Sequence, residues 1–262
     1  GGGDVSDAYR VALDDGRIVF AKTHRSPPPH FFATEAAGLR WLRAADAVAT
    51  PEVVASSDDR PAFLVLEWID EARRPPNDEA AFGRGLAALH GAGADAFGRT
   101  DRRTTGSLAL PNDPCSSWAE FFGAKRLLPL AAIARDRAAL SDRTIKDLEA
   151  VAERLEELAP PAAPARLHGD LWAGNRVVDA HGESWLIDPA AHGGHREYDL
   201  AMMRLFGGFG DAAFAAYHES WPLDPGWEER VALHQLAPLA VHAIKFGGSY
   251  VDATARAAAH YA

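Results

Sequence analysis

The chain of 262 residues is 47% hydrophobic and 24% charged, an ordinary composition for a globular protein with a sizeable core. No run approaches the roughly 18 apolar residues that cross a bilayer, so no membrane partner is expected. The 27 basic and 37 acidic residues give a net charge of -10 without any Lys/Arg block, which argues against nucleic acid as the main partner. Cys115 is the single cysteine and cannot form an internal disulfide, which predicts a reducing, cytoplasmic location.

The first seventy residues have the pattern of strands with one helix. Residues 8–13 and 17–23 are predicted strands on either side of the turn Asp14-Asp15-Gly16. The next segment is a predicted helix, whose inward stripe consists of Phe32, Glu35, Leu39 and Leu42. The apolar run over residues 63–66 is typical of a buried strand.

From residue 70 onward the pattern is mainly helical. Helices are predicted over 82–89, from Ser117, and from Ser141 as an N-cap to the prolines that follow Leu158. Residues 166–188 return to extended structure around a turn at His181-Gly182, and helices follow to the end. We therefore predict a bilobal α+β fold, with a small β-rich N-terminal lobe over 1–69 and a larger helical C-terminal lobe over 70–262.

The most informative stretch runs from His168 to Asn175 and reads HGDLWAGN. Asp170 and Asn175 are five residues apart, the offset of Asp and Asn in the kinase catalytic loop, and Asp188 follows thirteen residues later. Phosphoryl transfer needs a carboxylate to accept the proton of the attacking hydroxyl, and an amide oxygen and a second carboxylate to hold Mg²⁺. The ordered trio predicts these roles, although each residue alone is also a common turn former.

A lysine and a glutamate in the first lobe indicate the same chemistry. Lys22 ends a predicted strand in the sequence VFAK, in the manner of the kinase lysine that contacts the α- and β-phosphates. Glu35 lies thirteen residues later on the inward stripe, where a buried carboxylate needs a cationic partner. The spacing predicts a Lys22–Glu35 pair, whereas each residue taken singly is typical of the solvated surface.

The N-terminal sequence GGGDVS fits a glycine-rich phosphate loop with Ser6 in the place of the third glycine. Its position before the first hairpin makes Gly1, Gly3 and Ser6 candidate nucleotide contacts, with a simple glycine-rich terminus as the alternative. The chain begins without a methionine or a signal sequence, so we expect further residues upstream.

Several segments resemble the fructosamine (ketosamine) kinase family, which shares the protein-kinase-like fold with aminoglycoside and choline kinases. The matching segments are 167–175 (LHGDLWAGN), 186–190 (LIDPA), 194–202 (GHREYDLAM), 205–209 (LFGGF), 222–227 (PLDPGW) and 246–248 (FGG). The resemblance covers essentially the whole chain and is densest from 166 to 250. Family members commonly have Gly where Ala173 stands, and segment 191–194 differs from animal members, which leaves the preferred ketosamine open.

This resemblance implies ATP-dependent phosphorylation of a hydroxyl on a ketosamine, a sugar–amine adduct that is either a small molecule or attached to a protein. It implies that Asp170 is the catalytic base and that Asn175 and Asp188 bind Mg²⁺. It also implies that Lys22 contacts the phosphates and is held there by Glu35.

Other residues are assigned by the same resemblance to supporting roles. Segment 66–69, with Glu67, Trp68 and Ile69, is implied as the hinge that receives adenine through backbone groups. His168 and Asp199 are implied as residues that orient the catalytic loop.

The acceptor site is less defined by the sequence. Trp172 is a candidate for stacking on the sugar or its amine, and His195, Arg196 and His242 are further candidates that packing or loop hydrogen bonds explain equally well. Trp221 and Trp227 are assigned to packing. No zinc site is predicted, because His192 and His195 have no further soft ligands at suitable spacing.

Three other interpretations compete with this one. The first keeps the fold and chemistry but changes the acceptor to an aminoglycoside, a choline-like alcohol or homoserine. The second is a catalytically silent nucleotide-binding protein. The intact set of five predicted catalytic and ATP-binding side chains argues against it. The third is a serine hydrolase, for which the sequence has no nucleophile-elbow motif.

Overall fold

The computed structural model describes residues 6–72, 79–101, 104–105 and 108–262, and these form two compact units. Unit 1 combines residues 1–92, 168–191 and 208–221, and unit 2 combines residues 93–167, 192–207 and 222–262. The units therefore differ in extent from the lobes expected from the sequence, and the lobe boundary at residue 69 stays a prediction. None of the helices in the described ranges is long and apolar enough to cross a membrane.

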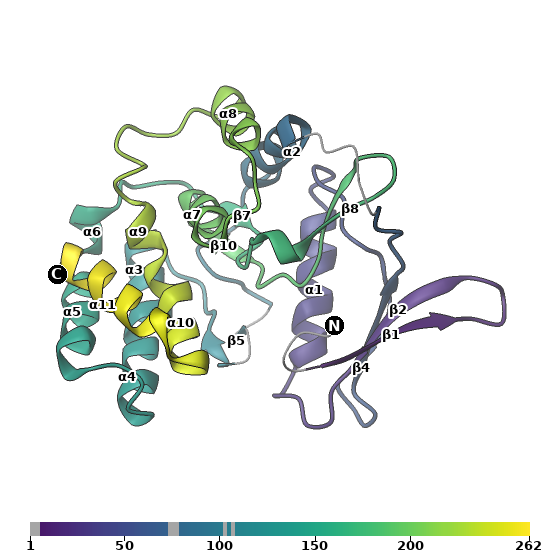
Figure 1. The fold of residues 1–262 in the computed structure, drawn as a ribbon, viewed down its shortest axis with the longest axis horizontal. Helices are drawn as coiled ribbons and strands as arrows, with labels where there is room; N and C mark the ends of the chain where they lie inside the picture. Colours follow the sequence, from purple (N-terminus) through teal and green to yellow (C-terminus); the bar gives the residue numbers. More distant parts are fainter. Residues whose placement is uncertain (1–5, 73–78, 102–103, 106–107) are drawn as a thin grey trace. The chain divides into compact units, whose positions relative to one another are not determined.

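A four-stranded antiparallel sheet forms the first part of unit 1 (Figure 1). Its spatial order is β1-β2-β4-β3, with the bounds β1 (Asp7–Ala12), β2 (Ile18–Thr23), β3 (Val53–Ser57) and β4 (Phe63–Glu67). The predicted hairpin turn is confirmed, and Gly16 adopts a φ of 86° there, which favours glycine. The pairing places Lys22 opposite Leu64 on the neighbouring strand.

The predicted helix is confirmed as α1 (Phe31–Arg43), which packs on this sheet. Phe32, Leu39 and Leu64 are fully buried between the helix and the sheet. Leu42 is also buried, so the apolar positions of the predicted stripe face inward. The same face carries Glu35, whose side chain is only 13% exposed.

The rest of unit 1 consists of a helix pair and a short hairpin. These elements are α2 (Glu79–Gly91), α8 (Asp211–Ser220), the 3₁₀ turn η2 (Ala173–Asn175), β8 (Arg176–Val178) and β9 (Ser184–Leu186). The hairpin confirms the extended segment and its turn, where Gly182 has a φ of 85°. Helices α2 and α8 approach closely at Gly83, where an added Cβ would lie 2.1 Å from the carbonyl oxygen of Ala213.

We expect Gly83→Ala to lower the free energy of unfolding by about 1–3 kcal/mol, because the methyl group forces two helices apart. The matched control in the same helix is Gly91→Ala, since an added Cβ there meets no atom within 4 Å. That control should be neutral or stabilising by up to about 1 kcal/mol. Denaturant titrations of both variants provide the measurement, and equal stability of the two would contradict the close approach at Gly83.

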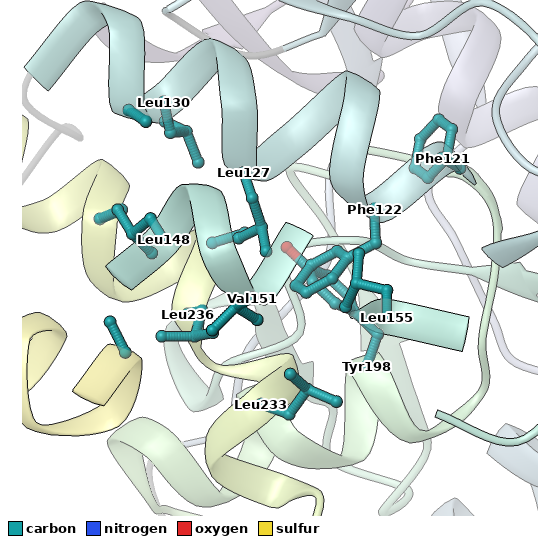
Figure 2. Close-up of a cluster of buried hydrophobic side chains, with 14 of the residues drawn as sticks. Phe121, Phe122, Leu127, Leu130, Leu148, Val151, Leu155, Tyr198, Leu233 and Leu236 are labelled. Atoms are coloured by element: carbon teal, nitrogen blue, oxygen red, sulfur yellow. The ribbon is translucent and has the colours of Figure 1, made fainter. Parts of the chain in front are cut away.

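Unit 2 is mainly helical. Its elements are β5 (Thr104–Thr105), β6 (Leu110–Pro111), α3 (Trp118–Phe122), the π-helical turn η1 (Gly123–Leu127), α4 (Leu128–Asp136), α5 (Asp142–Glu153), α6 (Leu155–Leu158), β7 (Ala165–Leu167), β10 (His192–Gly194), α7 (Glu197–Phe206), α9 (Val231–His234), α10 (Leu236–Phe246) and α11 (Ser249–Tyr261). Figure 2 shows the centre of its apolar core, where Phe122, Val151 and Tyr198 converge from three helices. Ser117 and Ser141 cap α3 and α5 as predicted, each accepting a backbone N–H three residues on.

Two local features of unit 2 differ from the sequence prediction. The long predicted helix after Ser141 is two helices, because the chain turns at Arg154, whose Nη1 donates to the carbonyl oxygen of Tyr261. The second feature is β10, which pairs with β7 where only helices were expected. Gly193 also lets the segment that ends at Gly98 approach β10, since an added Cβ would lie 2.0 Å from the carbonyl oxygen of Ala96, and glycines carry no periodic signal in a sequence.

Candidate active site

The segment from His168 to Asn175 places two predicted catalytic residues side by side. The Asn175 amide donates from Nδ2 to the main-chain oxygen of Asp170 at 2.8 Å and to its Oδ2 at 3.0 Å. Because both neighbours are acceptors, the nitrogen of the amide must face them. Oδ1 of Asn175 is therefore the side-chain atom left to coordinate a cation.

Backbone and imidazole hydrogen bonds connect this loop to the strand before Asp188. The Ile187 N–H donates to the carbonyl oxygen of Asn175 at 3.0 Å, and the Ile187 carbonyl lies 2.9 Å from Nε2 of His168. A carbonyl only accepts, so Nε2 of His168 carries the proton and its Nδ1 accepts the N–H of Asp170 at 3.3 Å. His168 is fully buried and bonds both to Asp170 and to Ile187, and its role in orienting the catalytic loop stays a prediction.

Asp188 follows immediately in a left-handed conformation, with a φ of 54°. Such a conformation is uncommon for residues other than glycine, although Asp and Asn tolerate it best, and it costs on the order of 1 kcal/mol or more. The Asp188 carboxylate contacts the ammonium group of Lys22. Lys22 in turn donates to Oε1 of Glu35 at 2.7 Å, so the predicted Lys22–Glu35 ion pair is present.

Burial and neighbouring charges both shift the pKa values of Lys22 and Glu35. Burial alone would lower the pKa of Lys22, but the carboxylates of Glu35 and Asp188 outweigh that effect and raise it. Burial raises the pKa of the Glu35 carboxyl, and Lys22 opposes the rise. Lys22 is therefore positively charged at neutral pH, which suits a residue that must contact an anion.

The candidate nucleotide contacts of the first strands are only partly described. Ser6 directly precedes β1, whereas Gly1 and Gly3 lie outside the described residues. Glu67 ends β4, and Trp68 and Ile69 follow it, with Nε1 of Trp68 donating to Oδ1 of Asp70 at 2.7 Å. The role of this segment as an adenine hinge stays a prediction.

The candidate acceptor residues have contrasting surroundings. Trp172 is 40% exposed, and its ring covers Gly174, where an added Cβ would lie 2.2 Å from the ring. His242 lies on α10 with Nδ1 2.8 Å from the Pro238 carbonyl oxygen and its ring against Phe206. Partial burial lowers the pKa of His242, so its imidazole is neutral at physiological pH.

Three further predicted residues lie in the buried part of unit 2. Arg196 donates from Nη2 to the Pro222 carbonyl oxygen at 2.5 Å, and His195 is fully buried. Their burial favours packing, the alternative that the sequence leaves open, and a role for either residue in binding the acceptor stays a prediction. Asp199 is also fully buried, in the first turn of α7, and its role in orienting the catalytic loop stays a prediction.

His195 belongs to a buried ion-pair network that the sequence did not indicate. Arg230 donates to both carboxylate oxygens of Glu197, at 2.6 and 2.9 Å, and Nε2 of His234 lies 3.3 Å from the same carboxylate. The rings of His195 and His234 stack with centroids 5.1 Å apart. Since His234 stands far from His195 in the chain, no motif or spacing links the two, and only the fold brings them together.

Among the described residues, His195, Glu197 and His234 are also a group whose ligand atoms lie close enough to hold a metal ion, all within 4.8 Å of one another. However, Arg230 already forms an ion pair with the Glu197 carboxylate. A divalent cation would place its charge beside this guanidinium in a buried site, at a high desolvation cost. The arrangement therefore favours an ion-pair network with two neutral histidines.

We expect this network to make the protein labile to acid. Burial lowers the pKa of His195 from 6.5 to about 3 and also lowers that of His234, so the unfolded chain binds protons that the folded chain excludes. Burial alone would raise the pKa of Glu197, but its contacts with His234 and Arg230 lower it to about 2. Stability should therefore fall below pH 6.5, by up to about 1.4 kcal/mol per pH unit for each histidine, with Glu197 adding to the loss below pH 4.5.

Denaturant titrations at pH 7, 6 and 5 measure this dependence. His234→Phe should reduce the dependence to the contribution of His195, and His181→Gln, at an exposed turn, should leave the dependence unchanged. A free energy of unfolding that stays constant between pH 7 and pH 5 would contradict the neutral state of the buried histidines.

Comparisons with known proteins all indicate one family. The sequence model of the fructosamine kinase family matches residues 1–261. The probable ketoamine kinase of Synechocystis sp. is 36% identical over 95% of this chain and 84% of its own length. The chloroplastic protein-ribulosamine 3-kinase of Arabidopsis thaliana is 33% identical over 95% of this chain and 77% of its own length.

Solved structures give the same result. A crystal structure assigned to a fructosamine-3-kinase of Thermobifida fusca is 42% identical, with a TM-score of 0.89 over 99% of this chain and 92% of its own. The amicoumacin kinase hAmiN shares only 15% identity, with a TM-score of 0.63 over 99% of this chain and 86% of its own, which shows the fold alone. The predicted kinase-like α+β fold is confirmed.

Proposed function

Since the chain belongs to the fructosamine kinase family and is thus a phosphotransferase that acts on ketosamines, we propose that residues of unit 1 transfer the γ-phosphoryl group of ATP to a ketosamine hydroxyl. The observation that carries this assignment is the network around Ile187, which links Asp170 and Asn175 to the strand before Asp188. It brings Asp170, Asn175 and Asp188 into one local structure, which supports the proposed roles of a base and two oxygen ligands in phosphoryl transfer.

In this proposal Asp170 aligns the acceptor hydroxyl for in-line attack and accepts its proton. The hydroxyl oxygen forms a bond to the γ-phosphorus while the bond from that phosphorus to the β–γ bridging oxygen breaks. ADP leaves, and the sugar carries the phosphate. The Asn175 amide donates to the Asp170 carboxylate, and the Asp170 N–H donates to Nδ1 of His168. These two hydrogen bonds keep the carboxylate oriented.

Asn175 and Asp188 fit a magnesium ion by the chemistry of their donors. The amide nitrogen of Asn175 is committed to Asp170, which leaves an oxygen for the metal, and Asp188 supplies a carboxylate that is 45% exposed. Hard divalent cations prefer such oxygen ligands. When bound, the metal neutralises charge that develops on the phosphates.

Lys22 supplies the protein's own positive charge for the phosphates, and Glu35 holds it in place. Ser6, with Gly1 and Gly3, and the hinge at Glu67, Trp68 and Ile69 complete the proposed nucleotide site. An anionic nucleotide is thus accommodated locally, although the chain as a whole carries a net charge of -10.

For the acceptor we propose a ketosamine of the fructosamine or ribulosamine type, free or attached to a protein. Trp172 supports this assignment, because an exposed indole beside the base can stack on a sugar or interact with a protonated amine. A role for His242, on α10 of unit 2, in binding the acceptor stays a prediction from the sequence. A cytoplasmic location belongs to the same proposal and is supported by Cys115, the single and buried cysteine.

The experiment that tests this function is an acceptor screen with ATP, coupled to identification of the product. Free fructosamines and ribulosamines, a glycated peptide, an aminoglycoside, choline and homoserine should be compared at equal concentration. We expect turnover with ketosamines alone. Inert ketosamines together with phosphorylation of another alcohol would refute the proposed acceptor, and absence of ATP turnover with every acceptor would favour a silent nucleotide-binding protein.

A further inference from the structure

Arg176 directly follows Asn175, and its side chain is only 4% exposed. The sequence gives no hint of this burial, because an arginine after a loop is usually solvated. Its Nη1 donates to Oε1 of Glu79 at 2.6 Å, and its Nε donates to Oγ of Ser184 at 3.0 Å. The guanidinium also lies over the ring of Phe82, 4.3 Å from the centroid.

Glu79 extends this contact to a second part of unit 1. Its Oε2 accepts the backbone N–H of Gly210 at 3.1 Å, so one carboxylate connects Arg176 to the loop before α8. Phe209 of that loop stacks on Phe82 with centroids 5.5 Å apart, and its centroid lies 5.7 Å from the Arg176 guanidinium carbon. Arg176 is therefore enclosed by α2 and by the loop that leads into α8.

The same loop also contacts the chain on the other side of Asn175. Gly208 has a φ of 87°, and an added Cβ there would lie 2.4 Å from Cβ of Ala173. The segment from Ala173 to Arg176 is thus held at both ends by residues 208–210. Asn175 lies between the two contacts.

Arg176 is equally well placed to act on Asp188. It opens β8 and pairs with Leu186 of β9, two residues before Asp188. Ile187 lies between Leu186 and Asp188, and its backbone N–H donates to the carbonyl oxygen of Asn175. Contacts that hold the Arg176 side chain in place therefore also hold Asn175 and Asp188, the two predicted metal ligands, in position relative to each other.

We propose that Arg176 is a positioning residue for the magnesium pair, which it holds through its ion pair with Glu79 and its contact with Phe82 and Phe209. The proposal rests on the proposed function, since it takes Asn175 and Asp188 as metal ligands. Helices α2 and α8 have their own close contact at Gly83, so loss of the Arg176 ion pair should loosen the metal site more than the fold. Side chains that orient metal ligands typically change metal affinity or activity by about 10–100-fold.

The test is a calorimetric titration of the intact chain with the ATP analogue AMP-PNP, with and without Mg²⁺. Arg176→Met keeps the length and apolar packing of the side chain but cannot bond to Glu79. We expect about a tenfold loss of affinity for AMP-PNP with Mg²⁺, and less than about a twofold change without it. The matched control is Arg135→Met, which breaks an ion pair of the same 2.6 Å length to Glu149 on the surface of unit 2 and should change neither affinity.

Two results would overturn the proposal: unchanged affinity with Mg²⁺, or an equal loss with and without it. If Arg176→Met does not fold, Arg176→Lys decides the question, because it keeps the charge for Glu79 and loses the flat contact with the rings. That variant should show the same selective, smaller loss with Mg²⁺, and a loss independent of Mg²⁺ would again refute the role. The titration uses no ketosamine, so a failed acceptor screen refutes the proposed acceptor and leaves this result standing.

Discussion

Replacing Asp170 with alanine is expected to lower kcat for ketosamine phosphorylation by about a hundredfold or more, while ATP binds with nearly unchanged affinity. The carboxylate is the group proposed to accept the hydroxyl proton in the transition state. Among the described residues Lys22 bonds to the carboxylates of Glu35 and Asp188, so the position of Lys22 does not depend on Asp170. A hundredfold loss corresponds to about 2.7 kcal/mol of transition-state stabilisation. Steady-state kinetics and calorimetry with AMP-PNP separate the two effects.

The decisive comparison for this residue is Asp170→Asn. Asn175 keeps its bond to the main-chain oxygen of residue 170 in both variants, and the asparagine also keeps a side-chain acceptor near Oδ2. The loop should therefore remain in place, while the ability to take up a proton is lost. Near wild-type kcat in Asp170→Asn would remove Asp170 as the base, and Asp252→Ala, at an exposed position on α11, should have no effect on kcat.

The largest loss is expected for Asp188→Asn, with kcat/KM lowered about a thousandfold, or about 4 kcal/mol. The substitution preserves the size of the side chain but removes the charge that contacts Lys22 and that is proposed to bind the metal. Lys22 retains Glu35 as its partner, so the fold should be affected little. The Mg²⁺ concentration for half-maximal activity should rise at the same time.

Asp179→Asn is the matched control for this variant because it lies in the same hairpin. Its carboxylate accepts the backbone N–H groups of His181 and Glu183 and the indole N–H of Trp185, and these bonds contribute to its lowered pKa. Its loss should reduce stability without changing the Mg²⁺ requirement. If both variants shift the Mg²⁺ requirement alike, the hairpin as a whole, and not Asp188 as a ligand, determines metal binding.

Much of the fold and of the candidate site follows from local signals in the sequence. The first hairpin, the capped helices and the Lys22–Glu35 pair follow from turn residues, caps and helical spacing, which act over fewer than twenty residues. The juxtaposition of Asp170 and Asn175 follows in the same way from a spacing of five.

Long-range contacts between residues without a shared pattern could not be predicted. Glu197 meets Arg230 and His234 only through tertiary packing, because 33 positions of chain separate it from Arg230 and more from His234. Arg176 and Glu79 are 97 positions apart, and neither residue type indicates burial. Ile187 links the loop to the strand before Asp188 through its backbone groups, which every residue possesses, so no residue type could have revealed this link.

The discontinuous composition of unit 1 affects how the protein can fold during its synthesis. A growing chain that has reached Leu167 already contains Lys22, Glu35 and α2, but it contains neither Asp188 nor α8. At roughly 5–20 residues per second, the partners of these groups arrive on the order of ten seconds after Ala92. Through that interval Lys22 has Glu35 but lacks Asp188, and α2 lacks α8, so the apolar face of α2 stays exposed on the nascent chain, where it favours aggregation.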